Sequence, residues 1–193
     1  ASRRLVISHV GSVSVGHGYR DAWPLIQACA RLASTGDVVL RFVGELPAAA
    51  IQQAKSLLGD NVEITGQVPH EQALRHMLAS DVLVLIHTAG DATDRFVITG
   101  KFFDYLKSNR ILMGIGSPEV GFNRLIQRHK LGQICSNRIA EIEACLRGIH
   151  RSWQAGRLAA LRENTGIDIA QFSRENQNRY FAELVERVAG NHR

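Results

Sequence analysis

The residues from 97 to 115 decide how this chain is interpreted, and they read Val97-Ile98-Thr99-Gly100-Lys101-Phe102-Phe103-Asp104-Tyr105-Leu106-Lys107-Ser108-Asn109-Arg110-Ile111-Leu112-Met113-Gly114-Ile115. The pattern predicts a loop, a short helix and then a buried strand. Thr99 and Gly100 can open the helix, because a hydroxyl caps free backbone amides and glycine lets another group approach the backbone closely. The free amides, the helix dipole and the Lys101 ammonium would face one point in space, which suits a phosphate.

Lys101 and Asp104 are the two side chains of this stretch that carry the most chemistry. Helix N-termini disfavour cations, so a lysine there indicates an anion held between its ammonium and the amides; the alternative is a solvated lysine. Asp104, one turn later, offers two acceptor oxygens that could take the hydroxyls of a ribose. It could equally be an acid that merely favours the first helical turn. A phosphate cradle beside a hydroxyl-binding carboxylate predicts a nucleotide ligand.

Strand and helix patterns alternate along most of the chain. Short apolar runs that predict strands lie at residues 5–10, 38–43, 62–65, 82–86, 111–115 and 131–135, with helical patterns between them. From about residue 139 the pattern is helical only, with breaks near Ala155-Gly156 and Thr165-Gly166, and a final helix is expected near 173–188. We therefore expect residues 1–193 to form one α/β domain. It should have a Rossmann-like parallel sheet flanked by helices, with a helical tail over about 139–193.

The glycine-rich and polar loops follow the last residues of four predicted strands: Val10, Val43, Thr65 and Ile86. Ligands of parallel α/β sheets bind at this edge, so we expect the loops to converge on one crevice. In the first loop, Gly16-His17-Gly18 would let the backbone approach a ligand, and Arg20 could bind a phosphate with two hydrogen bonds. Such glycines are also common turn-makers, and the chain contains neither GxGxxG nor GxxxxGK[ST].

Composition sets broad limits on class and partners. The chain has 193 residues, 45% of them hydrophobic, and a formal charge of +5, which attracts anions of any kind. The eight histidines show neither HxH nor HExxH spacing, so no metal site is expected. The tail arginines follow helical surface spacing and are interpreted as a solvated face, with contact to a membrane surface as the alternative: Arg147, Arg151, Arg157 and Arg162. Nucleic acid is not an expected partner.

Cysteine usage and the lack of a long apolar run predict a cytoplasmic protein. The three cysteines, Cys29, Cys135 and Cys145, include no CxxC pair, and Cys29 and Cys145 fall on apolar helix faces. No apolar run approaches the roughly 20 residues that span a bilayer. The chain starts at Ala1 rather than at a methionine, which leads us to expect a piece of a longer protein, with processing of the N-terminus as the alternative.

These motifs together resemble the C-terminal, donor-binding domain of GT-B glycosyltransferases of the group-1 (family 4) type. The likeness covers about residues 4 to 188. The matching segments are Gly11-Ser12 with Tyr19-Arg20-Asp21, Val43-Gly44, Val62-Glu63-Ile64-Thr65-Gly66-Gln67-Val68-Pro69, Ser80-Asp81-Val82-Leu83-Val84-Leu85, Gly100-Lys101-Phe102-Phe103-Asp104-Tyr105-Leu106 through Arg110-Ile111-Leu112, and Phe172-Ser173-Arg174-Glu175.

The resemblance implies a duty for each candidate site residue. The donor diphosphate would be held by Gly11, Ser12, Arg20, Thr99, Gly100 and Lys101. Asp104 would bind the ribose in place of the family's usual glutamate. Gly44 and Val68 would border the base. The family often has a second acid eight residues before the ribose ligand; this chain has Phe96 there, with Asp91 and Asp94 nearby.

The resemblance also implies an activity. The expected reaction is retaining, metal-independent transfer of a hexose from a nucleotide-diphospho-sugar, in polysaccharide or glycoconjugate biosynthesis, with no cofactor. The acceptor site belongs to an N-terminal domain absent from this sequence, so we expect this chain to bind donor without transferring sugar. It should be cytoplasmic, with contact to the inner membrane surface as a further expectation. The alternatives are a nucleotide-sugar epimerase, using His17, His87 and the acids of residues 91–94, and a non-catalytic nucleotide-binding module.

Overall fold

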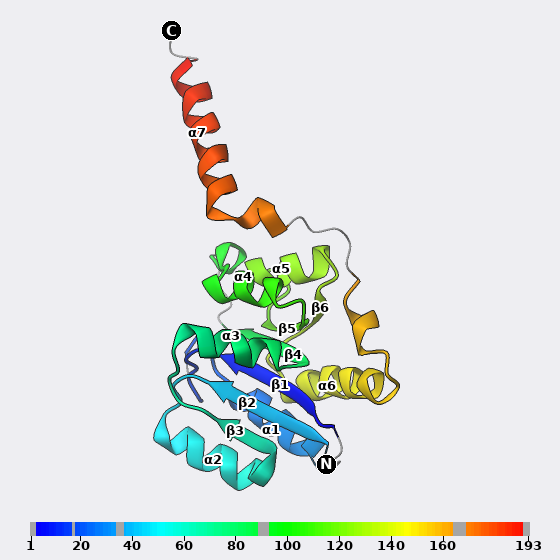
Figure 1. The fold of residues 1–193 in the computed structure, drawn as a ribbon. Coiled ribbons are helices and arrows are strands. Elements are labelled where there is room, and N and C mark those ends of the chain that lie inside the picture. Colours follow the sequence, from blue (N-terminus) through cyan, green and yellow to red (C-terminus); the bar gives the residue numbers. More distant parts are fainter. Residues whose placement is uncertain (1–2, 17, 34–36, 89–92, 164–168, 191–193) are drawn as a thin grey trace.

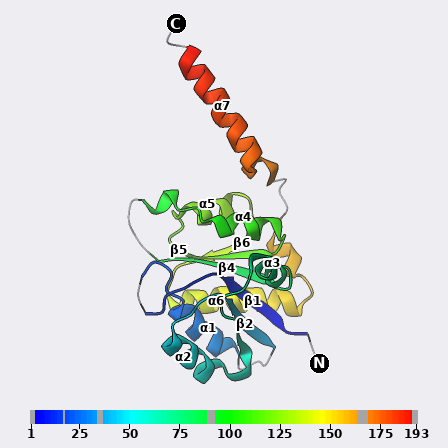
Figure 2. The same ribbon diagram turned by 60° about the vertical axis from the view of Figure 1, so that its left-hand side comes forward.

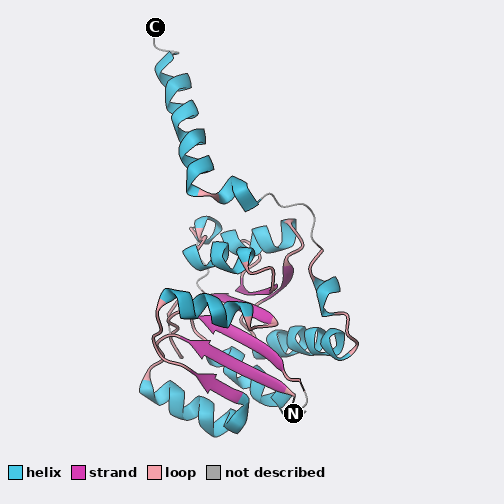
Figure 3. Ribbon diagram, viewed as in Figure 1, coloured by secondary structure: helices cyan, strands magenta, loops and turns pink. Residues whose placement is uncertain are grey.

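The computed structural model describes residues 3–16, 18–33, 37–88, 93–163 and 169–190. They form one parallel sheet of six strands in the order β3-β2-β1-β4-β5-β6 (Figure 1). The strands are β1 (Leu5–Val10), β2 (Val38–Val43), β3 (Val62–Ile64), β4 (Val82–His87), β5 (Ile111–Gly116) and β6 (Gly132–Cys135). The predicted α/β class with a parallel sheet flanked by helices is confirmed, and the strand arrows run the same way in Figure 3.

Seven α-helices and four short 3-10 helices complete this part of the chain. They are α1 (Trp23–Ala33), α2 (Ala48–Leu58), α3 (His70–Leu78), α4 (Gly100–Lys107), α5 (Gly121–Arg128), α6 (Ile139–Gln154), α7 (Arg174–Gly190), η1 (Gly59–Asn61), η2 (Asp94–Phe96), η3 (Leu158–Leu161) and η4 (Ile169–Phe172). Helices α1, α2 and α6 cover one face of the sheet, and α3, α4 and α5 cover the other (Figure 2).

The central strand β4 shows why the sequence reads as an uninterrupted apolar run. Val82, Val84 and Ile86 are buried under α1 and α6. Leu83 and Leu85 are buried on the opposite face, with α4 and α5. A strand covered on both faces needs apolar side chains at every position, because successive side chains point to opposite faces.

The helical tail is confirmed, and its last helix stands apart from the sheet. In Figure 1, α7 projects away from the layered domain. Its large apolar side chains are exposed, among them Tyr180 and Phe181. One expected break near 155–156 follows the end of α6 at Gln154. The other, near 165–166, lies outside the described residues.

The tail arginines are not uniformly solvated as predicted. Arg147 is exposed, and its Nη2 pairs with Oε1 of Glu143, one turn earlier on α6, at 2.7 Å. Arg162, by contrast, is half-buried, and its Nη1 donates to the carbonyl oxygen of Arg110 at 2.6 Å. The interpretation of Arg162 as part of a solvated face is therefore wrong. Helical spacing could not reveal this, because the acceptor lies 52 residues away in the chain.

The cysteines are free thiols with a structural setting. Cys29 is fully buried in the core, and burial raises the pKa of its thiol to about 12. Cys145 and Cys135 are half-buried and pack against the same core. Among the described helices, none has the length and apolar character needed to cross a membrane.

Candidate functional site

A cleft of about 530 Å³ opens at the carboxyl edge of the sheet, above β1 and β4 and beside the start of α4. Four of the predicted site residues line it: Arg20, Thr99, Gly100 and Lys101. Its other lining residues are His9, Tyr19, Leu85, Ile86, His87, Val97 and Phe122. The structure thus brings the glycine-rich loop and the start of α4 together, although they are some 80 residues apart in sequence.

Lys101 is the charged centre of this cleft. Its Nζ lies 3.4 Å from Nε2 of His9. Burial first, and then the nearby Arg20 guanidinium, lower the pKa of Lys101 to about 8. Two cations therefore face one partly enclosed space, and none of the described residues that line it has a carboxylate. An anion there would relieve their repulsion and raise the pKa of Lys101 back toward its usual value.

His9 supports Lys101 as a neutral acceptor. Its Nδ1 lies 2.9 Å from the carbonyl oxygen of Val84, so Nδ1 carries the proton and donates it. Burial, followed by the charges of Lys101 and Arg20, lowers the pKa of His9 to about 3. The Nε2 lone pair is then free to accept a hydrogen bond from the Lys101 ammonium. Sequence reasoning missed this residue; the available signal was a histidine inside an apolar strand.

Two glycines allow the close approach that this arrangement needs. A Cβ on Gly11 would lie 2.3 Å from Nζ of Lys101, so any larger residue would displace the lysine. A Cβ on Gly44 would lie 2.7 Å from the carbonyl carbon and oxygen of Gly11. The Gly11 amide donates to the carbonyl oxygen of Val43 at 2.6 Å, which fixes the loop against β2. Both glycines have positive φ angles, 112° and 139°, that side chains disfavour.

The start of α4 differs in one respect from the prediction. Thr99 is the N-cap residue, but its side chain makes no capping hydrogen bond. Its Oγ1 is instead buried with no hydrogen-bond partner among the described residues. The prediction that this hydroxyl caps the helix is therefore wrong, since the rotamer depends on local packing. The space beside Gly100 is open, and the first amides of α4 are not occupied by the Thr99 hydroxyl.

Tyr105 fixes α4 against the end of β1. The Val10 amide donates to the Tyr105 hydroxyl oxygen at 2.8 Å, and that hydroxyl lies 3.4 Å from the Val10 carbonyl oxygen. Burial raises the pKa of Tyr105. No sequence pattern reveals this bond, because the two residues lie 95 positions apart in the chain. The Tyr105 hydroxyl also sets the distance between Lys101 and the loop that follows β1.

The loop that carries Arg20 is held at both ends. Asp21 Oδ1 accepts from the Gly16 amide at 2.7 Å and from the Trp23 amide at 2.9 Å, where α1 begins. The Tyr19 ring stacks on His87, with centroids 5.8 Å apart. The Thr88 amide donates to the Tyr19 carbonyl oxygen at 2.8 Å. The loops after β1 and β4 are thereby joined, so Arg20 stands on a fixed backbone.

His87 and Asp94 form a second feature at the edge of the cleft. Nε2 of His87 lies 2.8 Å from Oδ1 of Asp94, which is only 3% exposed. The other oxygen of that carboxylate has no hydrogen-bond partner among the described residues. Phe96, at the position where the resembled family often has an acid, is 71% exposed beneath the Arg95 guanidinium. Asp91 and His17 lie outside the described residues.

The remaining predicted residues are not among those that line the cleft. Asp104 is half-buried on α4, and Ser12 is exposed in the loop after β1. Gly44 directly follows β2 and pairs with Gly66 in an isolated antiparallel bridge. Val68 packs against the core beneath α3 and α4. Within the described part of the chain, no group of three or more histidine, cysteine or acidic side chains could hold a metal ion.

Comparison with solved structures identifies the fold. HepE of Anabaena, solved with UDP and glucose, matches with a TM-score of 0.70 at 16% identity over 95% of this chain and 48% of its own. WaaG, a glycosyltransferase of lipopolysaccharide biosynthesis, matches with a TM-score of 0.65 at 17% identity over 89% of this chain and 45% of its own. The chain has the fold of one domain of a GT-B glycosyltransferase. It spans about half the length of these proteins.

A related enzyme class shares this GT-B domain fold. The UDP-GlcNAc 2-epimerase of Neisseria meningitidis, solved with UDP-GlcNAc, matches with a TM-score of 0.57 at 10% identity over 85% of this chain and 40% of its own. No protein-family model matches the sequence, and the search of curated proteins gave no match. At identities of 10–17% these comparisons show the fold alone.

Proposed function

We propose that this GT-B domain binds the nucleotide-diphospho-sugar donor of a glycosyltransferase. The observation that carries the proposal is the position of Lys101. Its ammonium lies directly over Gly11, beside a neutral histidine and in the same cleft as Arg20. The solved HepE complexes with UDP and glucose and with UDP-glucose support a nucleotide sugar as the ligand.

The charges of the cleft suit the step in which the sugar leaves the diphosphate. Negative charge then accumulates on the departing diphosphate. Arg20, Lys101 and the first amides of α4 would stabilise that charge without a metal ion, and donors already held in place act most effectively. The loop residues Gly11 and Ser12 would border the same diphosphate.

We also propose which residues bind the ribose and the base of the donor. Asp104, one turn along α4, would accept hydrogen bonds from the ribose hydroxyls. Gly44 and Val68 would border the base at the ends of β2 and of the loop before α3. We further propose a retaining transfer of a hexose, in the synthesis of a polysaccharide or glycoconjugate.

Sugar transfer by this mechanism would need a second domain in addition to this one. The chain spans about half of the matching proteins, so we propose that an N-terminal domain supplies the acceptor site. Without it the donor lacks an oriented acceptor and a cleft closed to water, and these two effects account for much of an enzyme's rate. This chain alone would bind donor and remain inactive.

Calorimetric titration tests the binding step. The chain should bind at least one of UDP, GDP and ADP, and should bind the corresponding nucleoside much more weakly, because the phosphates make the charged contacts. Failure of all three diphosphates to bind, both alone and with a supplied N-terminal domain, would rule out the donor site. Equal affinity for diphosphate and nucleoside would rule out the assigned phosphate contacts.

Nucleotide-sugar epimerisation is a second candidate, favoured by the His87–Asp94 pair at the cleft. A histidine held by a buried carboxylate can move a proton, as an epimerase requires. The two reactions differ in what they need. Formation of an epimeric nucleotide sugar in the absence of any acceptor would favour the epimerase, whereas acceptor-dependent release of nucleoside diphosphate would favour the transferase.

A further inference from the structure

A second pocket, of about 370 Å³, lies at the opposite edge of the sheet from the Lys101 cleft. It is formed where β4 and β5 begin, beside the end of α6 and η3. Strands of six residues separate the two edges by roughly 20 Å, so a ligand in one pocket does not touch the other. Its lining includes Arg3, Asp81, Asn109, Arg110, Trp153, Leu158 and Arg162.

The pocket has more positive than negative charge. Among the described residues that line it, three arginines face one carboxylate, that of Asp81. Asp81 is already engaged, because Oδ1 pairs with Arg3 at 2.7 Å and Oδ2 accepts from the Val6 amide at 3.0 Å. Neither Arg110 nor Arg162 forms an ion pair within the described residues. Two guanidinium groups in one pocket therefore lack a counter-ion.

Two backbone carbonyls hold Arg162 in place, although its guanidinium has no counter-ion among the described residues. Its Nη1 donates to the Arg110 carbonyl oxygen at 2.6 Å and its Nη2 to the Leu106 carbonyl oxygen at 3.4 Å. Burial lowers the pKa of Arg162. Half-burying a cation without a carboxylate is unfavourable, and two neutral carbonyls compensate for it only in part. The Nε atoms of Arg162 and Arg110 are also buried with no hydrogen-bond partner among the described residues.

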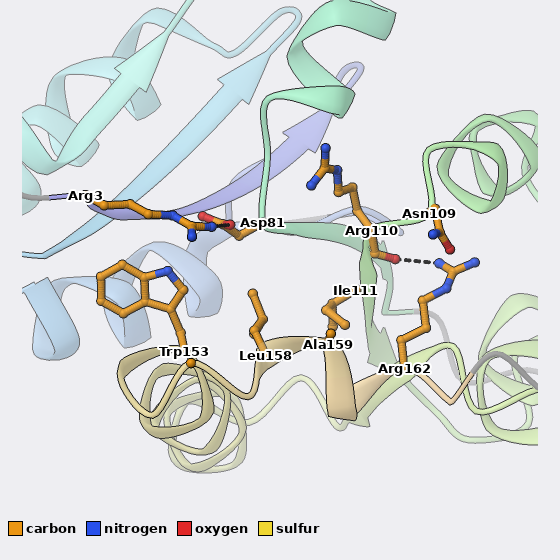
Figure 4. A pocket seen from close by; sticks show the side chains of 10 residues that line it. Arg3, Asp81, Asn109, Arg110, Ile111, Trp153, Leu158, Ala159 and Arg162 are labelled. Atoms are coloured by element: carbon orange, nitrogen blue, oxygen red, sulfur yellow. Dashed lines mark hydrogen bonds and ion pairs between the residues drawn. The ribbon is translucent and has the colours of Figure 1, made fainter.

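Arg110 follows a turn that directs its side chain to this edge. Asn109 adopts a positive φ of 56° just after α4, a conformation that asparagine tolerates better than most residues. No hydrogen bond or ion pair of the described residues holds the Arg110 guanidinium. In Figure 4 this guanidinium points away from that of Arg162, so it would have to turn to contact an anion bound there.

The other wall of the pocket is apolar. In Figure 4, Trp153 and Leu158 lie on one side, and Arg3 and Arg110 come from the side of the strands. Both apolar residues pack on the core with part of their surface uncovered. A volume of about 370 Å³ falls within the range of small-molecule pockets.

We propose that this pocket binds a small organic phosphate. Its phosphate would contact the Arg110 and Arg162 guanidinium groups, whose planar forks match phosphate oxygens. Its apolar or aromatic group would lie on Trp153 and Leu158. This ligand is distinct from the sugar donor, and the pocket does not depend on the function proposed for the Lys101 cleft.

Phenyl phosphate is a suitable probe, and tryptophan reports on the pocket directly. The chain has two tryptophans, and Trp153→Phe assigns their indole N–H resonances. Titration of the nitrogen-15-labelled wild-type chain should shift the Trp153 signal and leave that of Trp23 in place, while phenol should shift neither. An unmoved Trp153 signal at saturating phenyl phosphate would overturn the proposal.

Variants separate this pocket from the donor cleft. Arg110→Gln should weaken phenyl phosphate binding about tenfold or more and leave the melting temperature nearly unchanged, since the side chain makes no hydrogen bond or ion pair with the described residues. Arg162→Lys, which keeps a cation near the Arg110 carbonyl, should also weaken it. Lys101→Ala and the control Arg128→Gln should give the wild-type affinity when binding is followed at the Trp153 signal. Wild-type affinity in both pocket variants would contradict the proposal, as would loss of binding in Lys101→Ala alone.

Discussion

At the scale of single residues, the proposed donor site depends on a lysine whose charge is easily lost. Burial and Arg20 hold the pKa of Lys101 at about 8, and the neutral His9 accepts from it without adding charge. A bound diphosphate favours the protonated lysine, so binding and protonation are linked. The same linkage makes the affinity sensitive to pH.

Affinity for a nucleoside diphosphate should fall as the pH rises through the pKa of Lys101. Below about pH 7 the free lysine is already charged and affinity should be level. Above pH 8 each further unit should cost up to about tenfold, until the pKa of the complex is reached. Calorimetry between about pH 7 and pH 9.5 measures this. Lys101→Arg should remove the decline, and an equal decline in that variant would assign it to another group.

Gly11→Ala should displace the Lys101 ammonium although Lys101 itself is not substituted. The new Cβ would lie 2.3 Å from Nζ of Lys101, so the ammonium has to leave its position and diphosphate binding should weaken about tenfold or more. Gly16→Ala is the matched control, because that glycine also has a positive φ, 77°, but open space around it. Equal losses of affinity in the two variants would attribute the effect to backbone strain instead.

The sequence predicted the chemistry of individual residues only where it depends on local pattern. A lysine after Thr-Gly at a helix start can be recognised from neighbours in the chain, and Arg20, Gly100 and Lys101 do line one cleft. The partners of His9 and Asp94 depend on the tertiary fold. The unused hydroxyl of Thr99 depends on a rotamer choice that no sequence pattern encodes.

At the scale of elements, the position of α4 relative to β1 determines the cleft. Tyr105 makes that connection through its hydroxyl, which takes up the Val10 amide in a fully buried place. Without the hydroxyl, the Val10 amide would lose its acceptor, and no water could reach this buried place to take the hydroxyl's role. The energetic cost would fall on both stability and the alignment of Lys101.

Tyr105→Phe should lower the free energy of unfolding by about 1–3 kcal/mol, the usual cost of leaving a buried donor unsatisfied. It should also weaken diphosphate binding, though less than loss of Lys101. Urea denaturation of the variant and of Tyr180→Phe, whose ring is exposed on α7, measures the first effect. A change no larger in Tyr105→Phe than in the control would show that the bond carries no stability.

The elements themselves were predictable because their signals are strong. All six strands were expected within one or two residues of their observed bounds, since strands buried on both faces read as apolar runs ended by glycine or polar residues. The direction of Arg162, in contrast, is set by carbonyls of Leu106 and Arg110 from another part of the chain. Surface periodicity therefore misassigned it.

At the scale of the whole molecule, two basic pockets occupy opposite edges of one parallel sheet. The Lys101 cleft lies where such sheets bind ligands. We propose that it forms one half of a site whose other half belongs to a second domain. We expect this chain alone to bind donor and to release no sugar to an acceptor. Addition of the N-terminal domain, in trans or in one chain, should restore transfer. Transfer by this chain alone would contradict the two-domain proposal.

The most direct test of the central claim compares Lys101→Ala with Lys107→Ala, the exposed lysine in the last turn of the same helix. Each variant is titrated by calorimetry with the best-binding nucleoside diphosphate and with its nucleoside. Loss of Lys101 should weaken diphosphate binding by about 1.5–3 kcal/mol, or tenfold to a hundredfold, with little change for the nucleoside. Lys107→Ala should match the wild type. Equal losses for diphosphate and nucleoside in Lys101→Ala, or no loss for either, would contradict the donor site proposed here.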